Sequence, residues 1–150
     1  MRTLLYIFLI AAGLAGHYPK QPSDMKKLAP VLYVDEIEPT LPFWVDRLGF
    51  EITTEVPEGD RLGFVILKKG AVEIMYQTKE SVGKDVPELA DSPLAGSFLF
   101  IEVDNLDAVA AALEGIEPVV PRRMTFYGAD ELIMREPAGN VVTFAQFAGE

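Results

Sequence analysis

The sequence contains one arrangement of segments twice. Val34–Ile37 precedes an amphipathic stretch that ends at Leu48-Gly49, and three extended segments follow it. Val103–Leu106 precedes a second amphipathic stretch that ends at Leu113–Gly115, again with three extended segments after it. A repeated supersecondary unit constrains the fold more than any single motif, because each copy is expected to form the same unit. Two half-sheets of this kind, brought together, would enclose one cavity between them.

Each copy predicts the order strand, helix, strand, strand, strand. In the first copy, Leu41, Trp44, Val45 and Leu48 recur at three- and four-residue spacing, which is typical of an amphipathic helix. The polar segment 77–96 contains two prolines and is expected to be a linker. The fold class is therefore α+β, with two tandem βαβββ modules at about residues 28–77 and 97–147. The expected strands are 28–34, 50–56, 62–67, 71–76, 97–103, 118–127, 130–135 and 140–147, with helices at 38–48 and 106–113.

Length and composition restrict the class of protein. The 150 residues, 49% of them hydrophobic, are suited to one domain with its own core. The 23 acidic and 13 basic residues give a net charge of −10, which repels phosphate backbones, so no nucleic-acid partner is expected. Without cysteine, a thiolate metal site and a cysteine nucleophile are excluded. The only histidine, His17, precedes the first module, which excludes a histidine-based triad or a two-histidine metal site within one domain.

Residues 1–24 are expected to be a leader that is separate from the domain at 25–150. The apolar stretch Leu4–Ala15 would be about 18 Å long as a helix, too short for about 30 Å of hydrocarbon, so no membrane span is expected. One interpretation is a signal peptide over residues 1–15, with secretion or export to the periplasm. The other is that translation starts at Met25, which implies a cytoplasmic protein. Both remain open.

An ordered set of short motifs identifies a relationship. The set comprises Phe43-Trp44, Leu48–Phe50, Tyr127-Gly128, Glu136–Asn140 and then Phe144 and Gln146. In this order and spacing the motifs resemble the glyoxalase, bleomycin-resistance and extradiol-dioxygenase superfamily, also called vicinal oxygen chelate proteins. The resemblance covers about residues 28–147. It implies that the two modules form curled mixed sheets around a shared cavity.

The resemblance also implies four positions for metal ligands, on the first and last strands of each module. These positions hold Ala29, Glu73, Phe98 and Thr143 in this sequence. Only Glu73 is an ordinary metal ligand, whereas a divalent cation in such a site needs three or four protein donors. We therefore expect no metal and no other cofactor.

Strand alternation predicts which side chains line the cavity. With the four positions facing inward, the candidate ligand-binding residues are Tyr33, Glu73, Met75, Phe98, Phe100, Glu102 and Thr143. Phe98 and Phe100 could stack on a planar ligand, and Glu73 could accept a hydrogen bond from a cationic or amide group. The alternative is that both phenylalanines belong partly to the core and that the two glutamates are surface residues.

The favoured function is a metal-free small-molecule-binding protein. The resemblance to the bleomycin-resistance branch, whose members are acidic homodimers, implies a homodimer that sequesters a cationic or aromatic ligand. The alternative is a lyase, isomerase or dioxygenase of the same superfamily that uses Glu73 as base or metal ligand. No partner acid is visible for Glu73, so the sequence leans away from an enzyme and yields no firm catalytic residue. A third class, a protein–protein module that docks a partner through segment 77–96, also stays open.

Overall fold

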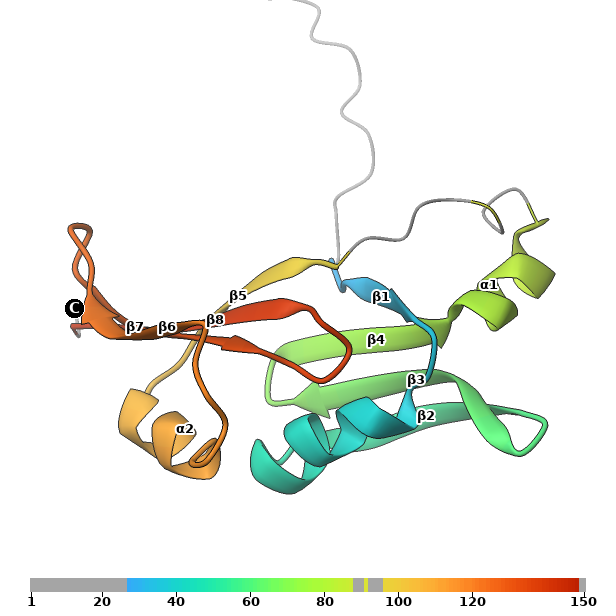
Figure 1. The fold of residues 1–150 in the computed structure, drawn as a ribbon, viewed down its shortest axis with the longest axis horizontal. Coiled ribbons are helices and arrows are strands. Elements are labelled where there is room, and N and C mark those ends of the chain that lie inside the picture. The colour runs from blue at the N-terminus through green and yellow to red at the C-terminus, as the bar shows by residue number, and fades with distance from the viewer. Residues whose placement is uncertain (1–26, 88–90, 92–95, 149–150) are drawn as a thin grey trace, which may run out of the picture.

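The structure, a computed structural model, describes residues 27–87, 91 and 96–148. It contains two four-stranded sheets, one from each module, in the orders β1-β4-β3-β2 and β5-β8-β7-β6 (Figure 1). In each sheet the first and last strands of the module pair in parallel, and the remaining neighbours are antiparallel. The predicted α+β class with two tandem βαβββ modules is therefore confirmed. The predicted leader, residues 1–24, lies outside the described residues.

The bounds of the elements follow the sequence prediction within a few residues. The first module consists of β1 Val31–Val34, η1 Glu38–Thr40, η2 Pro42–Arg47, β2 Glu51–Glu58, β3 Arg61–Lys69 and β4 Val72–Thr78, and α1 Lys79–Asp85 follows it. The second module consists of β5 Phe98–Glu102, α2 Leu106–Ala112, β6 Val120–Met124, β7 Ala129–Arg135 and β8 Val141–Phe147.

The first helix differs from the prediction. Instead of one α-helix over 38–48, the chain forms the 3-10 turn η1 and then the π-helix η2. Each piece has a proline in its first turn, where a missing N–H is tolerated, and a proline within a continuous α-helix would interrupt its hydrogen bonds. The N–H of Leu48 donates to the carbonyl of Phe43, five residues back, at 3.2 Å. Of the predicted amphipathic positions, Trp44 and Leu48 are buried and Leu41 and Val45 are partly buried against the core, whereas the buried Phe43 lies outside the predicted spacing.

The segment predicted as a linker contains the helix α1. Its N-cap is Thr78, whose hydroxyl accepts a hydrogen bond from the N–H of Ser81 at 3.1 Å. An ion pair between Glu80 and Lys84, four residues apart, adds further support at 2.8 Å. This short helix was not predicted, because its residues are polar and Pro87 follows them. Residues 88–90 and 92–95 lie outside the described residues.

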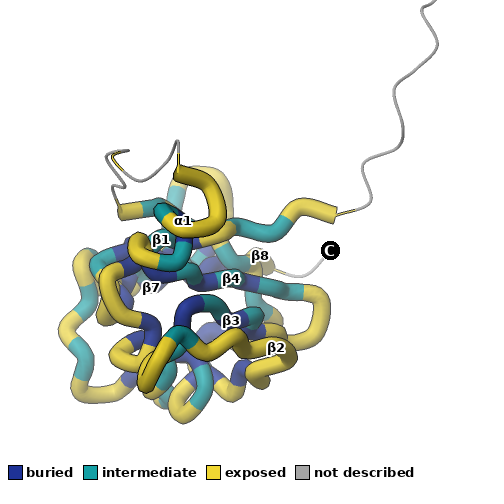
Figure 2. The backbone as a smooth tube through the Cα atoms, turned by 90° about the vertical axis from the view of Figure 1, so that its right-hand side faces the viewer, coloured by how far each residue is buried: buried dark blue, intermediate teal, exposed yellow. Residues whose placement is uncertain are grey.

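The helix-facing sides of both sheets share one hydrophobic core. Leu32, Val34, Ile74, Val142 and Phe144 alternate along their strands with residues of the outer faces, and all five are buried in one cluster. The cluster also contains side chains from η2 and α2, which lie in the lower half of Figure 1. The outer faces of the two sheets therefore point away from the core. Figure 2 shows the buried strands inside the molecule and β2 as an exposed edge.

A polar contact crosses this core between the modules. Tyr76 is completely buried on β4, and burial together with the Glu136 carboxylate of the second module raises the pKa of its hydroxyl. Glu136 is itself buried and accepts hydrogen bonds from the turn that joins β7 to β8.

Within the described part of the chain, no helix has the length and apolar character needed to cross a membrane.

Candidate ligand-binding site

The outer face of the second sheet carries exposed aromatic side chains. Phe98 and Phe100 on β5 are 85% and 56% exposed, which is unusual for large apolar groups. They lie beside Val141 and Thr143 on the adjacent strand β8. Strand alternation turns all four side chains to the same face. The structure thus brings together three of the predicted ligand-binding residues: Phe98, Phe100 and Thr143.

A hollow of about 450 Å³ lies on this face. Phe98 of β5, Val120 of β6, Ile133 of β7 and Thr143 of β8 are among the residues that line it. Arg135 stands at the rim, where its guanidinium donates to the carbonyl of Gly139 at 2.9 Å. The hollow is mainly apolar with few polar groups, the usual character of a small-molecule site.

A buried acid lies next to this hollow, and the sequence prediction missed it. Glu131 on β7 is 1% exposed although it lies on the outer face, in register with Ala145. Tyr127 covers it and donates a hydrogen bond to its carboxylate, and Arg123 donates to the other oxygen at 3.4 Å. The hydrogen bond to the Glu131 carboxylate raises the pKa of Tyr127.

A signal for Glu131 was present in the sequence. The alternation of Glu131, Ile133 and Arg135 along the strand places all three on one face. The prediction considered only the first and last strands of each module, where the family's metal positions lie. The third strand of the second module, β7, also contributes residues to the outer face.

The outer face of the first sheet carries the other predicted residues. Tyr33 on β1 and Met75 on β4 are half-buried. Glu73, on the same face of β4, forms an ion pair with Lys27 and keeps 11% of its side chain exposed. Lys68 lies directly opposite Glu73 on β3. The Glu73 carboxylate thus already has a cationic partner, Lys27, in its own chain.

The predicted residues are distributed over separate hollows of one chain. Phe98 and Thr143 line the hollow on the second sheet, whereas Tyr33 lines a polar one of about 320 Å³ near the β7–β8 turn. Glu102 borders a third, of about 400 Å³, between the modules. The helix sides of the sheets occupy the core, so the two outer faces of one chain do not close over a common ligand.

The family's metal positions do not fit a divalent cation here. Ala29 and Phe98 contain no donor atom, and Glu73 is held by Lys27. Thr143 contributes only a hydroxyl, a weak ligand without carboxylate or imidazole partners. Among the described residues, no three histidine, cysteine, aspartate or glutamate side chains are grouped as metal ligands would be.

Comparison with known proteins places this architecture in a family. The sequence profile of the Glyoxalase/Bleomycin resistance protein/Dioxygenase superfamily matches residues 27–144. The chain belongs to this superfamily, as the motif order predicted. No curated protein sequence shows significant similarity to it.

Solved structures share the fold. The bleomycin-binding protein of Streptomyces verticillus, solved with copper(II)-bleomycin, is 27% identical, with a TM-score of 0.57 over 86% of this chain and 100% of that one. Lactoylglutathione lyase from Agrobacterium tumefaciens is 20% identical, with a TM-score of 0.64 over 85% and 96% of the two chains. A glyoxalase/bleomycin resistance protein/dioxygenase from Nocardioides is 18% identical, with a TM-score of 0.64 over 85% and 86%.

Proposed function

We propose that this protein binds a small planar or cationic molecule on its outer sheet faces and sequesters it without chemistry or metal. The observation that carries the proposal is the exposure of Phe98 and Phe100 beside an apolar hollow of about 450 Å³. Two exposed phenylalanines on one strand cost solvation free energy, so a partner that covers them is expected to bind favourably. Planar aromatic groups stack on such rings.

An acidic group next to the aromatic surface supports a cationic ligand. Glu102 on β5 is exposed, lies in register with Ala145 of β8, and shares the outer face with Phe98 and Phe100. The net charge of −10 attracts cations to the molecule as a whole. The similarity to a bleomycin-binding protein, the only one of the three compared structures above 25% identity, points in the same direction.

The geometry around Glu73 supports binding rather than catalysis. A general base must be able to reach a proton of the substrate, and the Glu73 carboxylate is already engaged in an ion pair with Lys27. We therefore assign Glu73 to a hydrogen-bonding role toward the ligand, together with Tyr33 and Met75 on the same sheet face. The lyase, isomerase or dioxygenase alternative has no further residue of the described chain to support it.

A homodimer would bring the two outer faces together. One chain exposes apolar groups on both faces, namely Phe98 and Phe100 on the second sheet and Val31 and Val56 on the first. Its own core holds these faces apart. A second copy that covers the second-sheet face with its first-sheet face would enclose all seven predicted residues in one cavity, as the superfamily resemblance implies.

Calorimetric titration tests the ligand proposal. The protein is titrated with metal-free bleomycin, with copper(II)-bleomycin and with a planar aromatic cation, and binding is expected for at least one. Phe98→Ala and Phe100→Ala should each weaken that binding about tenfold or more, since stacking on one ring contributes about 1–3 kcal/mol. Phe126→Ala is the matched control, because Phe126 is fully exposed on the β6–β7 turn and outside the hollow. Equal losses in all three variants would contradict the proposal.

Elemental analysis tests the metal-free part. Protein purified without chelator is expected to contain less than about 0.1 equivalent of zinc, nickel, manganese or iron, because three or four donors are required for tight binding. A stoichiometric metal that Glu73→Gln removes would show that the carboxylate is a metal ligand and would favour an enzyme.

Sedimentation at increasing protein concentration tests the homodimer.

A further inference from the structure

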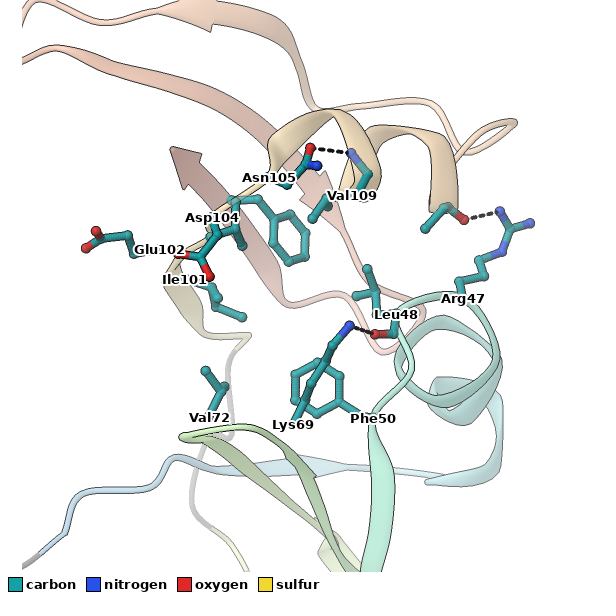
Figure 3. A pocket seen from close by; sticks show the side chains of 14 residues that line it. Arg47, Leu48, Phe50, Lys69, Val72, Ile101, Glu102, Asp104, Asn105 and Val109 are labelled. Atoms are coloured by element: carbon teal, nitrogen blue, oxygen red, sulfur yellow. Dashed lines mark hydrogen bonds between the residues drawn. The ribbon is translucent and has the colours of Figure 1, made fainter. Parts of the chain in front are cut away.

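A second hollow lies between the two modules, on the helix side of the sheets. It encloses about 400 Å³, within the usual range for sites that hold drug-sized molecules. Ile101 and Phe144 face it, whereas their strand neighbours Phe100 and Thr143 face the opposite side. It is therefore distinct from the outer-face site. The apolar walls come from both modules and comprise Leu48, Phe50, Val72, Ile101, Val103, Val109 and Phe144 (Figure 3).

Two cationic side chains are fixed at the rim of this hollow. The ammonium of Lys69 donates to the carbonyl of Leu48, and Figure 3 shows the side chain extending toward it. The guanidinium of Arg47 donates to the carbonyls of Glu114 at 2.9 Å and Ala112 at 3.4 Å. Backbone carbonyls thus hold both groups, and neither forms an ion pair with a carboxylate among the described residues. Lysine has three donors and arginine five, so each keeps hydrogens for a ligand.

The balance of charge at the hollow is positive. Glu102 borders it, but its side chain extends away from the hollow (Figure 3), as its outer-face position on β5 requires. Asp104 is the remaining carboxylate among the lining residues. Two cations against one facing carboxylate leave a local excess of one positive charge, in a chain whose net charge is −10. An apolar wall with one uncompensated positive charge is complementary to an apolar monoanion.

We propose that the inter-module hollow is a second binding site, for a small aromatic or branched carboxylate. The acid group binds Lys69 and Arg47, and the apolar body packs against Phe50, Ile101 and Val109. Because both modules supply the walls, the ligand also holds η2 against α2. This site does not depend on the outer-face function, and it selects a ligand of the opposite charge.

An NMR titration of the full-length protein with sodium 1-naphthoate tests the site. The expected result is saturable shifts of the amides of residues 48–50 and 103–109, with 1-naphthylmethylamine, a cation of similar shape, at least about fivefold weaker. Shifts confined to Phe98, Phe100 and Thr143 would overturn the proposal and leave the outer-face function standing. Absence of saturable shifts at millimolar naphthoate would overturn it as well.

Variants at adjacent positions separate charge recognition from stability. Lys69→Met keeps the apolar stem and should weaken naphthoate binding about fivefold or more, whereas Lys68→Met, which removes the neighbouring charge on the outer face, should not change it. Asp104→Asn removes the facing carboxylate and should strengthen binding about two- to threefold, an effect that a loss of stability does not produce. Equal affinities for the two lysine variants, or weaker binding to Asp104→Asn, would overturn the assignment.

Discussion

The indole N–H of Trp44 donates a hydrogen bond of 2.7 Å to the hydroxyl of Tyr76 in the core. Both side chains are completely buried, and Trp44 also makes edge-to-face contacts with Phe43 and Phe50 at 5.1 Å between ring centroids. The Tyr76 hydroxyl lies beside Glu136 of the second module, and burial together with the charge of Glu136 raises its pKa. This one hydroxyl therefore satisfies a donor from η2 and connects the two modules.

Removal of that hydroxyl should destabilise the protein. Tyr76→Phe leaves the buried indole N–H of Trp44 without its acceptor, which costs about 1–3 kcal/mol of unfolding free energy. Urea denaturation followed by tryptophan fluorescence measures the loss, since Trp44 is the single tryptophan. Tyr33→Phe is the control, because Tyr33 lies half-buried on an outer face, and its variant should differ from the parent by less than about 0.5 kcal/mol. Equal effects of the two substitutions would contradict the role of Tyr76.

Loss of a phenyl ring should reduce stability on the core face of the second sheet and leave it nearly unchanged on the outer face. Phe144→Ala removes a ring that is 2% exposed in the shared core and should cost about 3–5 kcal/mol. Phe98→Ala removes one that is 85% exposed and should change the unfolding free energy by less than about 0.5 kcal/mol in dilute protein. Chemical denaturation of both variants measures the difference. A large loss from Phe98→Ala would mean that this ring is structural and not part of a ligand surface.

The turn that joins β7 and β8 should depend on Asn140. The side-chain amide of Asn140 donates to Glu136 at 2.6 Å, and its oxygen accepts from the N–H of Ser97 at 2.8 Å. Asn140→Ala removes one donor from a buried carboxylate and the acceptor of Ser97, so we expect a loss of about 2–3 kcal/mol in denaturant unfolding. Asn105→Ala, which removes the exposed N-cap of α2, is expected to cost only about 1 kcal/mol. A reversed order would contradict the role of the turn.

Alkaline pH should remove the contact between Tyr127 and Glu131. The pKa of Tyr127 is raised in the folded state, because the hydrogen bond to the Glu131 carboxylate needs the protonated hydroxyl. The stability that this contact adds is therefore fully present below the unfolded-state pKa of about 10 and is lost as pH rises through the folded-state pKa. The difference in unfolding free energy between the parent and Tyr127→Phe should be constant from pH 6 to 9 and shrink toward pH 11. A difference that grows with pH would contradict the assignment.

Much of the fold was predictable because strand alternation and the repeat are local properties of the sequence. On β1, β4 and β8 the side chains that face the core recur at every second position, as strand alternation predicts. They are Leu32 and Val34, Ile74 and Tyr76, and Val142 and Phe144. The helical type of η1 and η2 was not predicted, because two prolines three residues apart permit several tight helical forms and packing selects among them. The helix α1 was missed because its polar residues carry little hydrophobic periodicity.

The candidate site was predicted only in part. Phe98, Phe100 and Thr143 do lie together, because adjacent parallel strands hold them in register. The sequence did not reveal the partners of Glu73 and Glu131. The Lys27–Glu73 pair joins residues far apart in sequence, and the carboxylate of Glu131 is bonded by Tyr127 of the β6–β7 turn and by Arg123 of β6.

The sequence alone determines the repeat, the strand alternation and the residues at the family's metal positions, of which only Glu73 is an ordinary ligand. Each of these depends only on residue type and local spacing. Tertiary structure decided how the two copies are joined. The helix side of each sheet is the more apolar side, so burial of both in one core turns the predicted ligand residues outward. The same packing creates the hollow between the modules, with Arg47 and Lys69 at its rim. A long-range arrangement of this kind depends on the sum of many weak contacts between distant segments, and no single segment encodes it.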